Sequence, residues 1–212
     1  MRRLPIYLLL DTSASMSGEP INAVQNGLNL LISTLRQDPY ALETAFLSVI
    51  TFDTEARQIV PLTEITDFQT PDIQARGVTA LGDALRTAAQ CINTEVQKSS
   101  AQVKGDWKPL VFLMTDGLPT DDWKPALQEY RVARPGLTVC CAAGPGVDTA
   151  VLSEISDTVV TLDTADSSTI SAFFKWVSAS ITVSSRKIDL TKDDAIGGDL
   201  PLPPAGISLI KT

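Results

Sequence analysis

The stretch LLLDTSASMS, residues 8–17, joins a run of leucines directly to an aspartate and three serines. The run Leu8–Leu10 is typical of a buried strand. Asp11, Ser13 and Ser15 stand at i, i+2 and i+4, so their side chains point the same way in an extended segment. A hydrophobic strand therefore ends in three oxygen-bearing side chains that face one place.

The rest of the chain alternates strand-like and helical stretches, an order typical of a mostly parallel sheet with helices on both faces. The predicted strands cover residues 5–10, 45–52, 56–62, 109–117, 136–144 and 158–163, and the predicted helices cover 20–35, 80–96, 121–134, 147–155 and 168–183. A short turn before residue 56 predicts a hairpin, which places the third strand antiparallel at an edge, where Pro61 is tolerated. We predict a doubly wound, Rossmann-like α/β fold with a six-stranded sheet that has one antiparallel edge strand.

The composition changes after about Ser185, where the chain becomes rich in Gly, Pro and Asp and loses any helical period. We therefore predict a domain over residues 1–184 and a C-terminal tail over 185–212. Three arrangements of the tail fit its composition. It folds back on the domain, it docks on a partner through polyproline-II or strand-addition contacts, or it is an unattached terminus.

The gross composition restricts the class of partner. The 212 residues are 44% hydrophobic and 20% charged, with a net charge of −8, which is typical of a globular protein. A strongly acidic balance argues against nucleic acid and anionic membrane surfaces, because both need a basic patch. The apolar part of MRRLPIYLLLD is too short for a signal peptide, and no run approaches the ~20 apolar residues of a membrane span. We expect a cytoplasmic protein.

The cysteine and histidine content excludes several kinds of site. Cys91, Cys140 and Cys141 form neither a disulfide framework nor a zinc-ligand spacing, so we expect buried, reduced thiols. The chain has no histidine. This absence removes the usual general base, the usual zinc ligand and the Ser-His-Asp triad.

Polar side chains stand at three places: directly after the first strand, just before a helix, and at the end of the central strand. Asp11, Ser13 and Ser15 form the first group, Thr79 lies in a glycine-flanked loop before a helix, and Asp116 ends the apolar run PLVFLMT. Because the carboxyl ends of parallel strands meet at one edge of a sheet, these residues converge if the first and fourth strands are neighbours. Five oxygen-bearing side chains without nitrogen or sulfur suit Mg²⁺, with Mn²⁺ or Ca²⁺ as alternatives.

Each of these residues alone has a simpler structural interpretation. Ser13 or Ser15 could cap a turn, Thr79 could be the N-cap of the helix after it, and Asp116 could only end a strand. The appearance of all three groups in order, each at a strand end or a helix start, favours a metal site. A cation held mainly by hydroxyls stays electrophilic and can accept one further carboxylate from a partner.

An enzyme is the main alternative class. Asp11 after the first strand is reminiscent of haloacid dehalogenase-type phosphatases, whose D-x-D motif has a second acid where this chain has Ser13. The chain has neither a G-x-x-x-x-G-K-[ST] phosphate loop nor a G-x-S-x-G elbow. We expect no catalytic residues, and a metal-dependent phosphohydrolase-like enzyme is the alternative.

The three motifs together resemble the metal-ion-dependent adhesion site (MIDAS) of von Willebrand factor type A (VWA) domains, and the resemblance covers residues 1 to about 184. All five motif positions are filled, by Asp11, Ser13, Ser15, Thr79 and Asp116. The sequence around the three motifs is similar to that of the bacterial TerY-type branch associated with tellurite resistance. The segments that carry this similarity are LDTSASMSGEPI, GVTALGDAL and VFLMTDGLPTDDW. This resemblance implies Mg²⁺ binding and non-enzymatic action in a stress response, with a Ser/Thr kinase and a PP2C-like phosphatase as partners.

An implied kinase partner makes three of the ligand residues candidate phosphoacceptors as well: Ser13, Ser15 and Thr79. A phosphate on any of them would add about two negative charges beside Asp11 and Asp116. Such a charge either recruits the cation or disrupts the geometry of its ligands, and the sequence does not decide between these effects.

Overall fold

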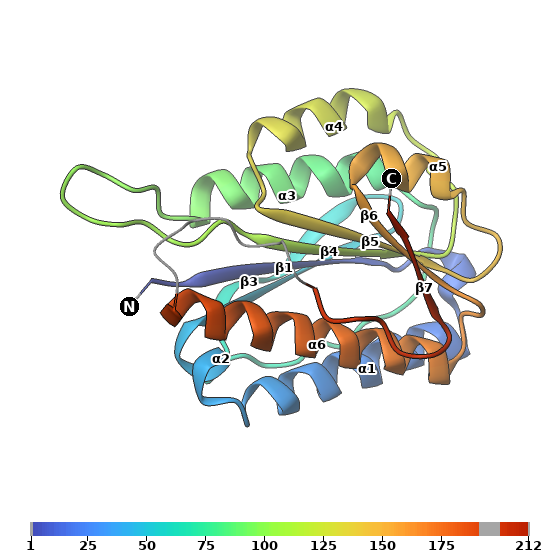
Figure 1. The fold of residues 1–212 in the computed structure, drawn as a ribbon. Helices are drawn as coiled ribbons and strands as arrows, with labels where there is room; N and C mark the ends of the chain where they lie inside the picture. The colour runs from blue at the N-terminus through green and yellow to red at the C-terminus, as the bar shows by residue number, and fades with distance from the viewer. Residues whose placement is uncertain (1, 191–199, 212) are drawn as a thin grey trace.

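A single seven-stranded sheet organises the chain in the computed structural model, which describes residues 2–190 and 200–211. The strand order is β3-β2-β1-β4-β5-β6-β7 (Figure 1). The strands are β1 (Leu4–Asp11), β2 (Ala45–Phe52), β3 (Ala56–Glu64), β4 (Leu110–Thr115), β5 (Leu137–Ala143), β6 (Thr158–Leu162) and β7 (Ile207–Lys211). β1, β2, β4, β5 and β6 are mutually parallel, and the two edge strands β3 and β7 are antiparallel to their neighbours.

Helices cover both faces of the sheet (Figure 1). One face carries α1 (Glu19–Leu35), α2 (Pro39–Thr44) and α6 (Ser167–Leu190), and the other carries α3 (Leu81–Glu95), α4 (Trp123–Val132) and α5 (Thr149–Ile155). Every residue of β1 and β4 is buried, as expected for central strands that are covered on both sides. The predicted mostly parallel sheet with helices on both faces is therefore confirmed.

Close packing of α1 on α6 depends on a glycine. A Cβ atom at Gly27 of α1 would lie 2.2 Å from the ring of Phe174 on α6, so no larger residue fits there without a shift. Phe174 is fully buried, and the hydrophobic core on this side of the sheet also contains Leu28, Leu31 and Val177. The apolar stripe predicted for the first helix therefore faces the last helix as well as the sheet.

The prediction of six strands with one antiparallel edge is corrected to seven strands with two. Residues ISLIK form β7, in which Ile207 pairs with Leu162 of β6. The end of the packed unit also differs from the predicted boundary at residue 184, because α6 continues to Leu190 and Trp176 Nε1 donates a hydrogen bond to Pro201 O at 2.7 Å. Residues 200–211 thus fold back on the domain, whereas the part of the predicted tail at 191–199 lies outside the described residues.

Within residues 2–190 and 200–211, none of the helices combines the length and apolar character that crossing a membrane requires.

Candidate metal site

Asp11 is fixed in place at the carboxyl end of β1. It is the last residue of that strand and is 1% exposed. Its Oδ1 accepts a hydrogen bond from the Ser13 backbone N–H at 2.8 Å, and its Oδ2 accepts one from the Thr115 hydroxyl at 2.5 Å. Because Thr115 ends β4, the neighbour of β1, this contact joins the ends of the two central strands.

Ser13 and Ser15 continue from Asp11 through a short 3-10 turn, Ala14–Met16. Their Oγ atoms are 2.9 Å apart, and Ser15 Oγ donates to Asp116 Oδ1 at 2.7 Å. The hydroxyls of the first motif and the carboxylate of the third therefore form one hydrogen-bonded chain. Ser13 stands at the N-cap position of the turn but makes no side-chain cap bond, so the simple capping interpretation does not explain it.

Thr79 brings the third segment to the same place. Its backbone carbonyl accepts from Thr120 N–H at 2.9 Å and from the Thr120 hydroxyl at 3.1 Å, which ties its loop to the loop after β4. A Cβ atom at Gly117 would lie 3.1 Å from Thr79 Oγ1 and 3.9 Å from Ser15 Oγ, so both hydroxyls lie beside this glycine. The N-cap of α3 is Ala80 and not Thr79. Within the described part of the chain, the Thr79 hydroxyl has no hydrogen-bond partner, although Thr79 is 6% exposed.

A second contact between the Thr79 loop and the segment after β4 was not predicted from the sequence. Asp121 and Asp122 precede α4 and are of the residue type that caps a helix, but Asp122, at the N-cap position, makes no side-chain cap bond to α4. The two carboxylate oxygens of Asp121 instead accept from the N–H groups of Gly82 and Asp83, both at 2.9 Å, and so cap α3. These partners lie 39 and 38 residues away, so the local sequence gives no signal for this contact.

The electrostatics of the site favour a cation. Burial raises the pKa of Asp11 above its ordinary value, against the opposing effect of the hydrogen bonds from Thr115 and Ser13. Burial also raises the pKa of Asp116, against the hydrogen bond from Ser15. Neither carboxylate forms an ion pair with any Lys or Arg within the described segments. Two partly desolvated carboxylates without a counter-ion are stabilised when a cation binds between them.

The donor set suits a hard divalent cation. It consists of two carboxylates and three hydroxyls, and all five are oxygen donors of the kind that Mg²⁺ and Ca²⁺ take. No group of three or more His, Cys, Asp or Glu side chains that could hold a metal occurs among the described residues. A metal at this edge therefore needs the hydroxyls as ligands. All five predicted residues are brought together by direct contacts or, for Thr79, through Gly117.

The fold and this arrangement define an α/β domain of the doubly wound type with a candidate cation site at the carboxyl edge of its sheet. Residues 6–175 match the family model of the von Willebrand factor type A domain, and the chain belongs to that family. Such domains are generally non-enzymatic interaction modules, and many bind their partners through a metal-dependent MIDAS. The prediction of a VWA domain is thus confirmed.

Solved structures share the fold at low sequence identity. A von Willebrand factor type A protein from Catenulispora acidiphila is 22% identical with a TM-score of 0.67, covering 85% of this chain and 43% of its own. Proximal thread matrix protein 1 from the mussel byssus, solved with a zinc-occupied MIDAS motif, is 20% identical with a TM-score of 0.59, covering 84% and 48%.

A curated relative is closer in sequence but much longer than the matched region. The uncharacterized protein sll0103 of Synechocystis sp. is 31% identical over 123 aligned residues, in a match that covers 55% of this chain and 26% of that protein. The chain therefore spans about a quarter of this relative's length in the match.

Proposed function

We propose that the chain is a metal-dependent protein-binding module in which Asp11, Ser13, Ser15, Thr79 and Asp116 hold Mg²⁺, with Mn²⁺ or Ca²⁺ as alternative ions. A partner protein then supplies a carboxylate as a further ligand. The observation that carries this proposal is the convergence of three loops on two carboxylates without a counter-ion, beside a Thr79 hydroxyl that is free to bind a ligand. Buried carboxylates in proteins are generally paired with a cation or bound to a metal.

The residues around the ion have separate tasks in this proposal. When bound, the ion supplies an electrophilic position for an incoming carboxylate. The Thr115 hydroxyl and the Ser13 N–H hold the Asp11 carboxylate in one orientation. The Ser15 hydroxyl orients Asp116, and the bonds from Thr120 to the Thr79 carbonyl keep the Thr79 loop against the loop after β4.

The finer part of the proposal is a TerY-type protein that acts in the cytoplasm in tellurite resistance or a related stress response. Its partners are a Ser/Thr kinase and a PP2C-like phosphatase. The support for this assignment is the likeness of the three motif segments, LDTSASMSGEPI, GVTALGDAL and VFLMTDGLPTDDW, to that branch. The acidic net charge of −8 supports the absence of nucleic acid among the partners.

Phosphorylation by the kinase is part of the same proposal, and burial separates the three candidate hydroxyls. Ser13 is 2% exposed and Thr79 is 6% exposed, whereas Ser15 is exposed at the surface. A kinase can therefore reach Ser15 without local unfolding. Mass spectrometry after incubation with the kinase is expected to find phosphate on Ser15, and phosphate confined to residues outside the ligand loops would remove this part of the proposal.

The decisive experiment compares two aspartate-to-asparagine variants at the same edge of the sheet. Asp116→Asn is expected to lower Mg²⁺ affinity, measured by isothermal titration calorimetry, and to abolish capture of the kinase or phosphatase in Mg²⁺. Asp148→Asn is the matched control for folding and Mg²⁺ affinity, because Asp148 lies in the loop after β5 and caps α5 through Ala150 N–H at 2.9 Å, a role that asparagine fills. The chelator EDTA is expected to reproduce the effect of Asp116→Asn.

Two outcomes would contradict the proposal. Capture that survives both EDTA and Asp116→Asn would remove the metal from the mechanism. Turnover of a phosphorylated substrate by the purified chain, lost in Asp11→Asn, would favour the phosphohydrolase-like alternative. That alternative lacks its second acid, because Ser13 occupies the position.

A further inference from the structure

Two large apolar side chains are exposed directly beside the metal ligands. Val78 is 49% exposed and precedes Thr79, and Leu118 is 55% exposed and follows Gly117. Their loops are joined by the hydrogen bond from Thr120 N–H to Thr79 O, and Gly117 itself lies against the Thr79 hydroxyl. Each of the two loops that carry Thr79 and Asp116 therefore presents an exposed apolar side chain within two residues of a proposed ligand.

Exposed carboxylates surround the same edge. Four of the five loops that follow a parallel strand present an exposed acid, and a fifth exposed acid begins α1 directly after the remaining loop: Glu55, Asp122, Asp148 and Asp163, and Glu19. The loops are in contact with one another. Thr12 N–H donates to Phe52 O, Ala80 N–H donates to Asp53 O, and Gly144 N–H donates to Leu162 O.

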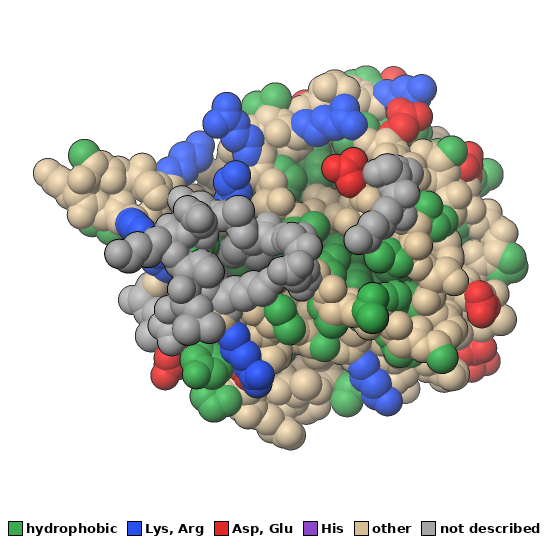
Figure 2. Space-filling model, viewed as in Figure 1, with side chains coloured by type: hydrophobic (Ala, Val, Ile, Leu, Met, Phe, Trp, Pro, Cys, Tyr) green, Lys and Arg blue, Asp and Glu red, His purple; other side chains and the backbone are tan. Residues whose placement is uncertain are grey.

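The cations at this edge are few, and two of them are already paired. Arg57 forms an ion pair with Glu55 and Arg76 forms one with Asp53, while Lys124 lies over the ring of Trp123. In Figure 2 several acidic side chains lie on the right-hand rim, the side on which β1 and β4 end in Figure 1, and many of the basic side chains lie at the upper left and along the top. A single bound divalent cation therefore leaves negative potential around the site.

From these surroundings we infer that the partner presents its carboxylate next to an aliphatic side chain, within a segment rich in Lys and Arg. This inference rests on the proposed metal-dependent function and adds the chemistry of the partner. The ion attracts one carboxylate, Val78 and Leu118 bury the neighbouring aliphatic group, and the surrounding acids attract basic flanks and repel acidic ones.

The apolar and the charge contributions to affinity differ in their dependence on salt. Burying one aliphatic side chain against Val78 and Leu118 changes affinity by roughly tenfold or more, independent of salt. The charge contribution acts between exposed groups, so it weakens as salt shortens the Debye length below about 10 Å. The apolar and charge parts of the inference can therefore be measured separately.

The first experiment selects ligands without assuming a partner. A library of random peptides displayed on phage is bound to the immobilised full chain in Mg²⁺ and eluted with EDTA. The expected pool contains an Asp or Glu beside Leu, Ile or Val, with Lys or Arg in the flanks. A pool with the acid but without aliphatic and basic enrichment would overturn the inference and leave the proposed function in place. The absence of any pool released by EDTA would overturn both.

The second experiment measures the most enriched displayed peptide, made synthetically, against variants of the chain. The double variant Val78→Ser, Leu118→Ser is expected to weaken peptide binding roughly tenfold or more and to leave Mg²⁺ affinity unchanged. The matched control is Val103→Ser, Val132→Ser, because these valines are 66% and 77% exposed and lie outside the ligand loops. Equal peptide affinity for the two double variants would overturn the apolar part.

A separate double variant tests whether the exposed acids attract basic residues of the partner. Asp122→Lys, Asp163→Lys reverses two exposed charges that make no side-chain hydrogen bond or ion pair in the described chain. At low salt this double variant is expected to bind the peptide severalfold more weakly than the wild type, and at high salt the difference is expected to vanish. Binding that is unchanged at low salt would overturn the charge part.

Discussion

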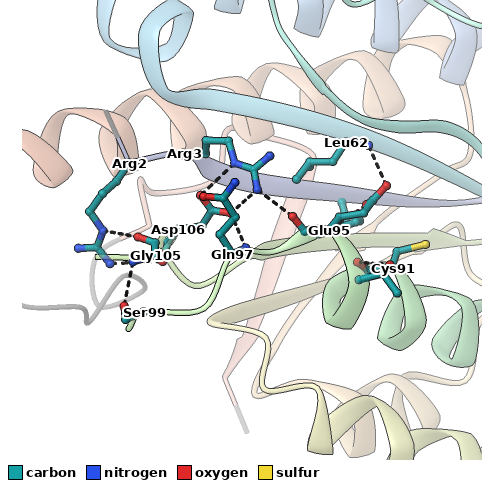
Figure 3. A network of polar contacts seen from close by, with 11 residues as sticks. Arg2, Arg3, Leu62, Cys91, Glu95, Gln97, Ser99, Gly105 and Asp106 are labelled. Carbon is teal, nitrogen blue, oxygen red and sulfur yellow. Dashed lines mark hydrogen bonds and ion pairs between the residues drawn. The ribbon is translucent and has the colours of Figure 1, made fainter. Parts of the chain in front are cut away.

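The acids at the two ends of the central strands β1 and β4 differ in their hydrogen-bond partners. At the amino end, Asp106 accepts two hydrogen bonds from the Arg3 guanidinium, at 2.9 and 2.5 Å (Figure 3). The Glu95 carboxylate there accepts from Tyr7 Oη at 3.0 Å, from Gln58 Nε2 at 3.0 Å and from Leu62 N–H at 3.2 Å. At the carboxyl end, Asp11 and Asp116 accept only from hydroxyls and a backbone N–H.

The pKa shifts also differ between the amino end and the carboxyl end of the central strands. At the amino end, the hydrogen bond that Arg3 donates to Asp106 raises the pKa of Arg3, which means that this contact stabilises the charged guanidinium. At the carboxyl end, burial raises the pKa of both Asp11 and Asp116, which means that the fold disfavours their charged forms. A saturated network contributes to folding, whereas an unsaturated one keeps its binding capacity for a ligand.

The largest effect on folding is expected at the saturated end. Asp106→Ala leaves Arg3 without its carboxylate and removes an acceptor from Gln97 N–H, so the free energy of unfolding is expected to fall by about 3 kcal/mol. Urea denaturation measures this change. Mg²⁺ affinity is expected to stay at the wild-type value, because no residue of the proposed metal site is changed.

The control for that variant is an exposed ion pair. Arg86→Ala breaks the contact with Glu129, whose side chains are 37% and 56% exposed, and is expected to change stability by less than about 1 kcal/mol. Equal losses in the two variants would mean that the network at the amino end has no special stabilising role.

At the carboxyl end of the central strands, a substitution is expected to change metal affinity and not stability. Asp116→Asn keeps an acceptor for the Ser15 hydroxyl and removes a charge that the fold disfavours. A folded-state pKa above the unfolded value makes the ionised carboxylate unfavourable to folding at neutral pH, so stability without metal is expected to be unchanged or higher. Mg²⁺ affinity is expected to fall roughly thirtyfold or more, about 2 kcal/mol. A large loss of stability in the absence of metal would show that Asp116 has a structural role instead.

The parts of the site that the sequence predicted are those set by local geometry. Asp11 and Asp116 each stand at or just after the end of a hydrophobic strand, and strand ends of neighbouring parallel strands meet. Ser13 and Ser15 follow from their spacing to Asp11. The sequence therefore contained enough information to bring these residues together once β1 and β4 were taken as neighbours.

The parts that the sequence did not predict depend on contacts between distant segments. Asp121 looks like the N-cap of the helix after it, yet it caps α3, because Gly82 allows the two segments to approach. β7 has only five residues after a stretch rich in Gly and Pro, and its place beside β6 is decided by pairing and packing rather than by its own pattern. The left-handed turn at Gly206, with φ of 85°, directs the chain into that strand.

A smaller effect is expected where the scaffold positions the site. A Cβ atom at Gly82 would lie 2.8 Å from Asp121 Oδ2 and 2.8 Å from Trp123 Cα, so Gly82→Ala pushes the first turn of α3 away from the segment after β4. Mg²⁺ affinity is expected to fall roughly fivefold, about 1 kcal/mol, because Thr79 and Asp116 move apart. Gly27→Ala is the control, since it clashes with Phe174 on the other face and should lower stability without changing Mg²⁺ affinity. Equal Mg²⁺ affinities for both variants would contradict the positioning role.

The smallest effect is expected for the reactivity of the three buried cysteines, which we expect to be the same with and without metal. Cys91, Cys140 and Cys141 are buried, and burial raises the pKa of Cys91 to about 11, so little reactive thiolate exists at mildly alkaline pH. The native chain is expected to react very slowly with Ellman's reagent, at the same rate in Mg²⁺ and in EDTA, and all three thiols are expected to react in urea. Cys91 lies on α3 one turn before Glu95, so its rate reports on the saturated end. Faster reaction of Cys91 in EDTA would mean that metal binding reaches across the domain and that the two ends are not independent.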